Sequence, residues 1–413
     1  YVMNKIYLSV IAFLLIGCSA KSPEIQFESL LDSEWLKIIE DNPVYASSMG
    51  DLSRNTEWSD TSVENVYLEH QHDLDILNQL EELDVSNFSE DNKVNYSLFK
   101  KQYENSIEGH EYKTYLIPFS HRGGIQLQHE TTSVVPLRNK QHYLDWIERI
   151  SKIDVLVDAA IVKAKIGIVE EIVPPRFLMQ KVYKQIELQA FIDPIDSPFY
   201  RTFMEMDRSI NDADVKEIQE KALETIKTKV IPAYVKLHRF FKEEYLPACR
   251  TSIGIKEINN GKEYYEFLAR KFTTTNLTPK EIHDIGLKEV ERIRGEMDAV
   301  IKEVKWEGTF KSFLDDLRTN PKFYYETSEE LFESYLATSK RIDPELVKLF
   351  KVLPSMPYGL KPIPMESAPD TTTAYYQRPA ADGSRAGYYY VNLYRPEVRP
   401  KYEIEVLSVH EAM

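Results

Sequence analysis

The sequence predicts a mainly α-helical protein, one large helical domain with a small antiparallel sheet near residues 371–394. Two long segments, 214–245 and 278–304, repeat their apolar residues at the three- and four-residue steps of an amphipathic helix. Late in the chain, two aromatic segments flank the pair Asp382-Gly383, a combination typical of a hairpin. Helices therefore form most of the expected fold, and the sheet comes after them.

Composition fits a large folded body. With 43% hydrophobic residues, 26 Tyr and 18 Phe among 413 residues, the chain can bury a sizeable core. Its formal charge of −15, from 51 basic and 66 acidic residues, argues against a nucleic-acid partner, because the phosphate backbone attracts basic proteins. We therefore expect no nucleic acid among its partners.

The N-terminus predicts a membrane anchor. After a short charged start, the apolar stretch 6–16 is too short to span a bilayer but suits the core of a signal peptide. The run LIGC, ending at Cys18, resembles the signal of bacterial lipoproteins, in which the Cys is lipidated and becomes the mature N-terminus. We expect a signal peptide over 1–17 and a lipidated Cys18 with a tether over 18–27. Ser19 fits the outer membrane, with the body facing the periplasm; a buried strand is the alternative for 6–16.

Four segments after the tether have the composition or the period of helices. Segments 62–83 and 89–109 contain no Pro, and 139–170 carries apolar residues at mixed three- and four-residue steps. In 214–245 the apolar residues fall on one face of a helix. Pro232 is expected to kink this helix, because it has no N–H to donate.

The clearest helix begins at Thr278. The residues from Thr278 to Glu281 read TPKE, a capping box with Pro at the first helical position. The apolar face behind it continues to Val304, and His283 lies off this face, so we expect that imidazole at the helix surface. After Leu353 the chain becomes Pro-rich and irregular until the aromatic strands begin.

Two other groups of reactive side chains are expected to be structural. His70 and His72 lie in helical surroundings, where a two-residue step turns the imidazoles apart, so no metal site is expected there. Cys249 is expected to be a buried apolar side chain, because no His–carboxylate pair lies near it in sequence.

The last feature is an apolar segment with His410 next to Glu411. A zinc hydrolase needs an imidazole to hold the metal and a carboxylate to deprotonate the metal-bound water. Adjacent His and Glu on one helix supply both groups, provided that further ligands follow. The sequence ends at Met413, so we expect a metal site that is cut off, and a 413-residue chain that binds zinc weakly and cleaves no peptide.

The His-Glu pair alone carries little weight. Two further pairs begin at His110 and His129, and none of the three completes the H-E-x-x-H spacing of metallopeptidases. Solvated surface residues are therefore the alternative interpretation of each pair.

Several stretches resemble the bacterial "domain of unknown function 885" proteins, often envelope lipoproteins. The resemblance runs from about Phe27 to the end and rests on KFTTTNLTPKEIHDIGLKEVERI, FKVLPSMPYGLKPIP, AYYQRPAADGSRAGYYYVNL and SVHEAM. In that family His-Glu-Ala usually continues as Pro-Gly-His-His, and the proteins are similar to helical zinc metallopeptidases. The resemblance implies a metallopeptidase-like domain over 28–413, with His410 as a zinc ligand and Glu411 as the general base.

The strand before this motif carries candidate substrate-binding residues. An edge strand beside a metal can pair its backbone with an extended peptide, and one face of GYYYVNLY would then meet the substrate. Tyr388, Tyr390 and Asn392 are the candidates on this strand, with packing as the alternative for the tyrosines. Arg385 is expected either to bind a substrate carboxylate bidentately or to form a surface salt bridge.

Two classes of function remain open from the sequence. The first is a zinc-dependent peptidase of the bacterial cell envelope that acts on peptides. The second is a non-catalytic lipoprotein that binds peptides or acts as a scaffold on a peptidase-like fold. Paired His residues and a later helical Glu downstream of Met413 would favour the enzyme.

Overall fold

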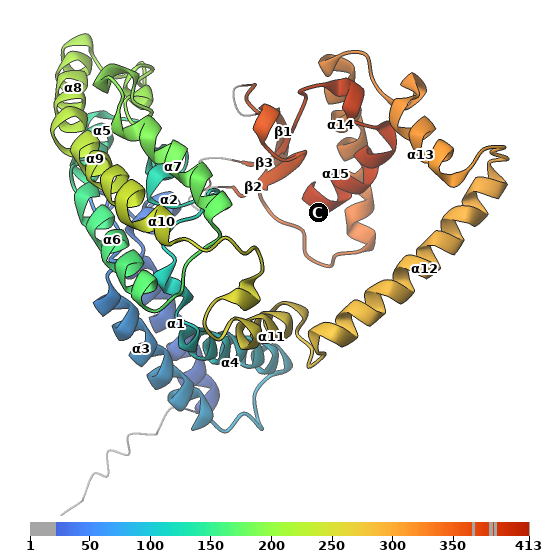
Figure 1. The fold of residues 1–413 in the computed structure, drawn as a ribbon, viewed down its shortest axis with the longest axis horizontal. Helices are drawn as coiled ribbons and strands as arrows, with labels where there is room; N and C mark the ends of the chain where they lie inside the picture. The colour runs from blue at the N-terminus through green and yellow to red at the C-terminus, as the bar shows by residue number, and fades with distance from the viewer. Residues whose placement is uncertain (1–21, 366–367, 380–382, 384–385, 413) are drawn as a thin grey trace, which may run out of the picture.

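A computed structural model describes residues 22–365, 368–379, 383 and 386–412. The mainly helical prediction is confirmed, and Figure 1 shows two lobes joined by one long helix, α12 (Pro279–Glu303). The N-terminal lobe contains α1 (Pro23–Asp41), α2 (Pro43–Met49), α3 (Val63–Glu81), α4 (Glu90–Glu111), α5 (Lys140–Ser151), α6 (Ile153–Val169), α7 (Arg176–Ala190), α8 (Asp212–Thr225), α9 (Ile231–Phe240), α10 (Leu246–Ala248) and α11 (Gly261–Thr273). The C-terminal lobe contains α13 (Phe310–Thr319), α14 (Ser328–Ile342), β1 (Tyr358–Pro362), β2 (Ala374–Gln377), β3 (Gly387–Val391) and α15 (Ile404–Ala412).

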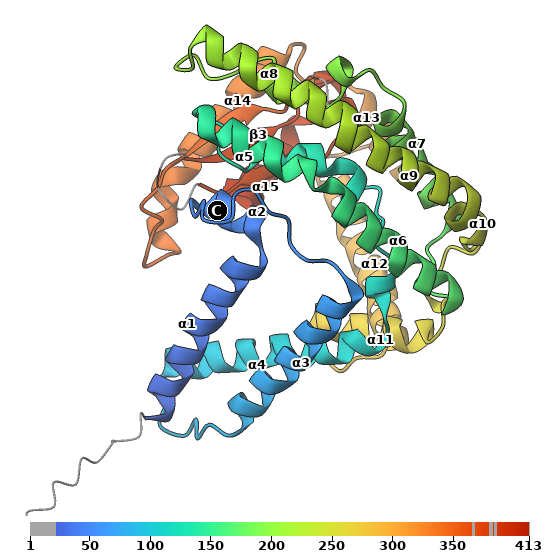
Figure 2. The same cartoon turned by 90° about the vertical axis from the view of Figure 1, so that its left-hand side faces the viewer.

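Each lobe has its own core. The largest cluster of buried side chains lies among α5 to α9 and includes Trp146, Tyr234 and Phe241. A smaller cluster around Phe27 and Leu80 joins α1, α3 and α4, which Figure 2 shows as a separate group of helices at one end of the lobe. The C-terminal lobe packs its sheet on α14 and α15. Within the described ranges, no helix is long and apolar enough to cross a membrane.

The predicted helices before α12 are present with changed boundaries. Segments 62–83 and 89–109 correspond to α3 and α4, whereas 139–170 is divided at Lys152 into α5 and α6. Segment 214–245 lies in an uninterrupted helical run from α8 to α10, which Figure 2 shows as one curved rod. Just before Pro232, which lies in the first turn of α9, the run holds a π turn (Ile226–Val230) rather than a plain α-helical kink. The wider π turn accommodates Pro232, which has no N–H to donate to a carbonyl of the preceding turn.

The capping box at the start of α12 is confirmed. Thr278 Oγ1 accepts a hydrogen bond from the Glu281 amide at 3.2 Å, and the Glu281 carboxylate accepts from the Thr278 amide at 2.8 Å. Most of the apolar face of this helix, however, is not covered by other parts of the protein. Ile293 is 44% exposed and Val300 is 50% exposed, and Ile301 is the one residue of α12 classed as buried. Tertiary packing therefore contributes little to α12, and local capping and ion pairs stabilise it instead.

The sheet contains a strand that the sequence did not predict. β2 and β3 pair antiparallel, with Ala374 opposite Val391, as expected for the two aromatic segments. β1 joins them on the other side of β3 and runs parallel to it, so the order is β1-β3-β2. β1 comes from the Pro-rich segment that was expected to be irregular. Pro362 is tolerated because it ends a strand at the edge of the sheet.

Two helical glycines should respond oppositely to Ala. In α6, a Cβ on Gly167 would lie 2.8 Å from the Leu116 carbonyl oxygen and 2.9 Å from that of Ile172, so Gly167→Ala should destabilise the protein by about 1–3 kcal/mol. In α12, a Cβ on Gly286 meets nothing within 4 Å, so Gly286→Ala should stabilise the helix by about 0.5–1 kcal/mol. Urea unfolding of both variants checks this prediction. Equal effects of the same sign would contradict the assigned packing of α6.

Candidate functional site

The candidate site lies on α15, which packs on α14 and on the sheet. Ile404 and Ser408 face inward and are buried, whereas Val406 is 72% exposed. His410 is exposed, and Glu411, one residue later, is half-buried. The helix therefore turns Glu411 toward the lobe and His410 toward solvent.

Glu411 faces a buried tyrosine. Tyr389 of β3 is fully buried, and its ring meets that of Tyr335 from α14 edge to face at 5.9 Å. Burial is the main cause that raises the pKa of the Tyr389 hydroxyl, and the Glu411 carboxylate raises it further. The neighbouring Ser408 hydroxyl lowers it in part, yet neither Tyr389 nor Ser408 has a partner at full hydrogen-bond geometry among the described residues. The Glu411 carboxylate therefore acts electrostatically on a buried pair of neighbouring hydroxyls, those of Tyr389 and Ser408.

More tyrosines surround this pair. Burial raises the pKa of Tyr335 to about 12. The Tyr358 hydroxyl donates to Asp343 Oδ1 at 3.1 Å, and burial, with the Asp343 charge, raises its pKa to about 12. These phenols remain protonated at neutral pH, so they can donate hydrogen bonds to an anion but do not act as bases there.

The opposite face of the sheet presents half-exposed aromatic rings. Tyr388 and Tyr390 alternate with the buried Tyr389, as predicted from the period of the strand. Tyr390 stacks on Tyr375 of β2 with ring centres 4.8 Å apart, and the Lys361 ammonium lies 3.7 Å above the Tyr388 ring. In Figure 1, β2 and β3 lie on the side of the C-terminal lobe that is nearer to α7. This face can therefore contact a ligand that enters between the lobes.

The strand expected to be an edge is central. β3 pairs with β1 on one side and β2 on the other, so its backbone is occupied and cannot add an extended peptide. This corrects the expectation that GYYYVNLY pairs with the substrate. The outer edges of β1 and β2 are the positions where a peptide strand could be added.

Asn392 is satisfied by the protein itself. The side chain is fully buried, and its amide nitrogen donates to the carbonyls of Ala368 at 2.8 Å and Thr372 at 3.1 Å. Its oxygen accepts from the Tyr394 amide at 3.0 Å. This side chain holds the loop before β2 in place, and none of its surface reaches solvent. Arg385 and Cys18 lie outside the described residues.

The described residues of α15 supply an incomplete set of zinc ligands. His410 is one imidazole and Glu411 one carboxylate, and tight binding of zinc needs at least three protein ligands. Among the described residues, no group of three or more His, Cys, Asp or Glu side chains could hold a metal ion. The residues of α15 therefore do not form a zinc site by themselves.

Cys249 has the structural role that was expected. It is 1% exposed, and burial raises the pKa of its thiol to about 12. A protonated, inaccessible thiol is a poor nucleophile.

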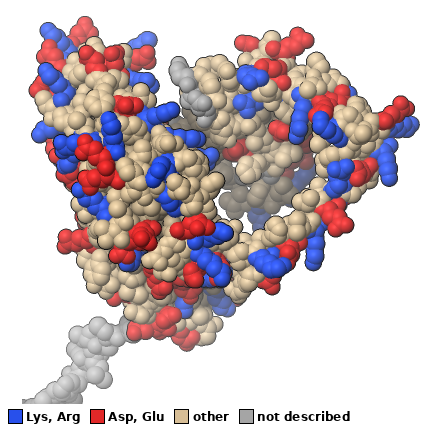
Figure 3. Space-filling model, viewed as in Figure 1, with Lys and Arg blue, Asp and Glu red and all other residues tan. Residues whose placement is uncertain are grey.

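The space-filling view shows where a larger ligand could enter. In Figure 3 a hollow separates the two lobes and is bordered by α12. Basic and acidic side chains are interspersed over this face of the molecule, without a large area of one sign.

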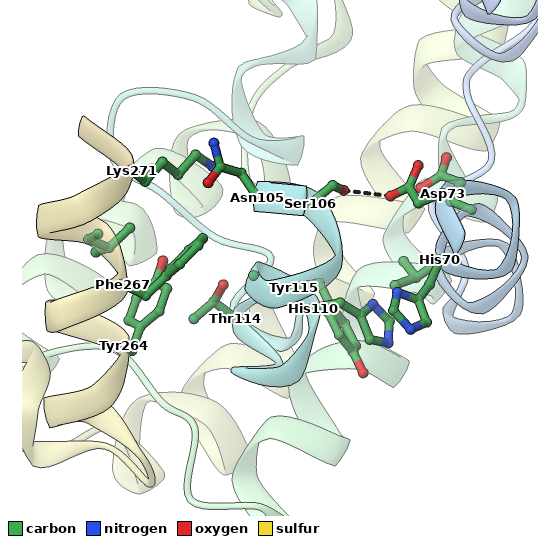
Figure 4. Close-up of a pocket in the computed structure, with 14 residues that line it drawn as sticks. His70, Asp73, Asn105, Ser106, His110, Thr114, Tyr115, Tyr264, Phe267 and Lys271 are labelled. Carbon is green, nitrogen blue, oxygen red and sulfur yellow. Dashed lines mark hydrogen bonds between the residues drawn. The ribbon is translucent and has the colours of Figure 1, made fainter. Parts of the chain in front are cut away.

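A second cavity lies in the N-terminal lobe and was not predicted. It has a volume of about 320 Å³ and lies between α3, α4 and α11 (Figure 4). The rings of His70 and His110 stack there with centres 3.9 Å apart, while His72 points to Glu34 at 2.9 Å. The prediction that His70 and His72 face apart is thus confirmed. No local pattern in the sequence indicated the cavity, because its walls come from segments about 40 to 200 positions apart.

Comparisons with known proteins agree with this architecture. No curated protein matches the chain. The crystal structure of a candidate lipoprotein from Colwellia psychrerythraea matches with 22% identity and a TM-score of 0.80, covering 95% of this chain and 71% of that one. A candidate lipoprotein of unknown function from Shewanella oneidensis matches with 14% identity and a TM-score of 0.62, covering 95% of this chain and 70% of that one. At these identities the likeness shows the fold alone.

The family assignment rests on the sequence. A model of the family described as bacterial protein of unknown function, DUF885, matches residues 43–413, which include the N-terminal lobe from α2 onward, α12, the sheet and α15. The chain therefore belongs to the DUF885 family.

Proposed function

We propose that this protein is a zinc-dependent peptidase of the bacterial cell envelope. The observation that carries the proposal is the arrangement of α15, where an exposed His410 adjoins a half-buried Glu411 that faces Tyr389. An accessible imidazole suits a metal ligand. A half-buried carboxylate next to the proposed ligand on the same helix suits a general base, because it could accept a proton from a water held at the metal.

Each residue has a defined part in this proposal. Bound zinc would polarise the scissile carbonyl and acidify a bound water. Glu411 accepts the proton of the attacking water, and the phenols around Tyr389 stay protonated and limit water access from the lobe interior. Tyr388 and Tyr390 contact peptide side chains through their exposed ring faces. Arg385 is proposed to pair with a substrate carboxylate.

The proposal requires ligands beyond His410. At least two more must complete the zinc site, and the described residues do not supply them. The test measures zinc content and peptide hydrolysis for the natural gene product, purified in full. About one zinc per chain, together with cleavage of a peptide library followed by mass spectrometry, supports the proposal. A metal-free protein that binds peptides without cleaving them would support the scaffold alternative instead.

The proposed location follows from the N-terminal segment. The two similar structures belong to candidate lipoproteins, and this supports lipidation of Cys18. The outer membrane, with the body facing the periplasm, is proposed from Ser19 alone. Expressed in a bacterium, Cys18→Ser should move the protein out of the detergent phase or leave the precursor uncleaved. Cys249→Ser is the matched control, because it removes the buried thiol and leaves the anchor intact. Identical partitioning of the Cys18→Ser variant and the parent would refute the anchor.

A further inference from the structure

The cavity between α3, α4 and α11 contains charged side chains that form no ion pair among the described residues; the Lys271 ammonium lies over the Phe267 ring, 5.7 Å from its centre. Glu69 and Asp73, four residues apart on α3, line one side, and Lys271 of α11 lines the other. None of the three belongs to an ion pair among the described residues. Glu69 accepts a hydrogen bond from the Asn65 side-chain amide at 3.0 Å, and Asp73 accepts one from the Ser106 hydroxyl at 2.6 Å. Both of these hydrogen-bond donors are neutral.

Their surroundings make this arrangement costly without a ligand. Burial is the largest cause that raises the pKa of both Glu69 and Asp73. Glu69 is exposed at the cavity mouth, so the cost of desolvation falls mainly on the half-buried Asp73. Lys37 of α1 and Lys163 of α6 act on Glu69 at longer range, without an ion pair. A cationic group placed here would offset the desolvation of both carboxylates.

The cavity of about 320 Å³ shares a wall with a larger neighbouring cavity of about 530 Å³. Asn105 and Ser106 line both, together with Glu69, Asp73 and Lys271. Figure 4 shows Lys271 and Asp73 at opposite ends of this wall, with Asn105 and Ser106 between them. The site is therefore dipolar, with negative charge on α3 and positive charge on α11.

The other acidic residues of the second cavity are already paired. Glu34 accepts from Tyr103 at 2.5 Å and contacts His72 at 2.9 Å, and Asp41 pairs with Lys37 at 2.5 Å. These pairs need no ligand. Two carboxylates and one ammonium remain unpaired in the wall that both cavities share.

Aromatic side chains form the rest of the wall. His70 and His110 stack against each other, Tyr115 lies on His110 with ring centres 5.1 Å apart, and Phe267 closes the α11 side. The buried Nδ1 atom of His70 has no hydrogen-bond partner among the described residues. Flat apolar faces with a few polar groups are typical of sites for small organic ligands.

We propose that this cavity binds a free basic α-amino acid. Its two cationic groups pair with Glu69 and Asp73, its carboxylate pairs with Lys271, and its methylene groups lie along the aromatic wall. The ligand thus brings two positive charges and one negative charge to a site that has the opposite set. This inference stands on the N-terminal lobe alone, so failure of the proposed peptidase activity would leave it intact.

Calorimetric titration with L-arginine and L-lysine tests the proposal on the whole protein. Both should bind. Agmatine, which lacks the carboxylate, and L-citrulline, which lacks the side-chain charge, should each bind about tenfold more weakly or worse. L-glutamate should not bind. Absence of arginine binding at millimolar concentration would overturn the proposal, and so would agmatine binding as tightly as arginine.

Variants locate the site. Asp73→Asn and Lys271→Gln should each weaken arginine binding about tenfold or more, because each leaves one ligand charge unpaired. Asp75→Asn, on the same helix but outside the cavity, is the matched control and should bind as the parent does. Melting temperatures confirm that the variants are folded. If arginine bound all four proteins equally, the ligand would sit elsewhere and the assignment would fail.

Discussion

In the natural gene product, purified in full, Glu411→Gln is expected to remove most of the peptide hydrolysis while leaving bound zinc in place. The amide is nearly the same size as the carboxylate but cannot accept a proton from the attacking water. General-base catalysis contributes about 100- to 10,000-fold to such reactions, so the rate should fall by that factor. Zinc content and the rate of cleavage of one peptide, measured on the same preparation, check the prediction.

Two further variants make this result specific. Glu405→Gln changes an exposed carboxylate on the same helix and should leave the rate unchanged. His410→Ala removes the proposed ligand and should lower both zinc content and rate. Full activity of the Glu411→Gln variant would show that the base lies elsewhere. Loss of zinc from that variant would instead show that Glu411 holds the metal.

Acid should destabilise the N-terminal lobe through His129. This imidazole lies beside Gln189, whose amide nitrogen is 3.1 Å from His129 Nδ1, and its ring meets Phe199 at 5.7 Å. The same amide nitrogen is 3.5 Å from the Gln126 carbonyl oxygen, so it acts as a donor. His129 must then accept at Nδ1, which only the neutral ring can do. Burial, and secondarily the Arg201 charge, lowers the pKa of His129 to about 4.

The direction of the pH effect follows from these values. The unfolded chain binds a proton at this imidazole below its ordinary pKa of 6.5, whereas the folded protein does so only near 4. Stability from His129 is therefore complete above pH 6.5 and is lost as the pH falls toward 4. The gap between the two values corresponds to about 3 kcal/mol, an upper value because the side chain keeps some solvent contact.

Urea unfolding at pH 7 and at pH 4 tests this, with His129→Gln as the variant. Between the two pH values the free energy of unfolding of the parent should fall by about 3 kcal/mol more than that of the variant. Carboxylates titrate in both proteins, so their contribution cancels in this comparison. His283→Gln, on the exposed surface of α12, should follow the parent. A His129→Gln variant with the same pH dependence as the parent would assign the acid sensitivity to other groups.

Local patterns predicted the helices, because the signals for a helix lie within a few residues of each other. The capping box at Thr278 is one example, and the helix it starts runs to Glu303. Strand β1 was missed because its only support is pairing with β3, more than 20 positions later. The helical period of the apolar residues also failed to predict how much of α12 is buried. The period shows that a helix has an apolar face, but it does not show which part of the protein covers that face.

The candidate site was predictable only in part. The buried amide of Asn392 was expected to need partners, and it has them, but they are backbone carbonyls of a loop that the sequence could not place. The sequence indicated that His410 and Glu411 lie on a helix, but their exposure depends on how that helix packs on the rest of the lobe. The cavity around His70 and His110 depends on how α3, α4 and α11 pack, so no single stretch of sequence could indicate it.

The length of α12 would amplify a small rotation at one of its ends. At 1.5 Å per residue, its 25 residues span about 37 Å, so a rotation of about 10° at its base would displace the far end by about 6 Å. A non-glycine residue with positive φ stands near each end, Thr274 at 55° and Lys305 at 56°. For a β-branched residue such as Thr274 this conformation is strained, and Gly would relieve it. A single-residue change in that turn would therefore be amplified into a difference in the width of the hollow between the lobes.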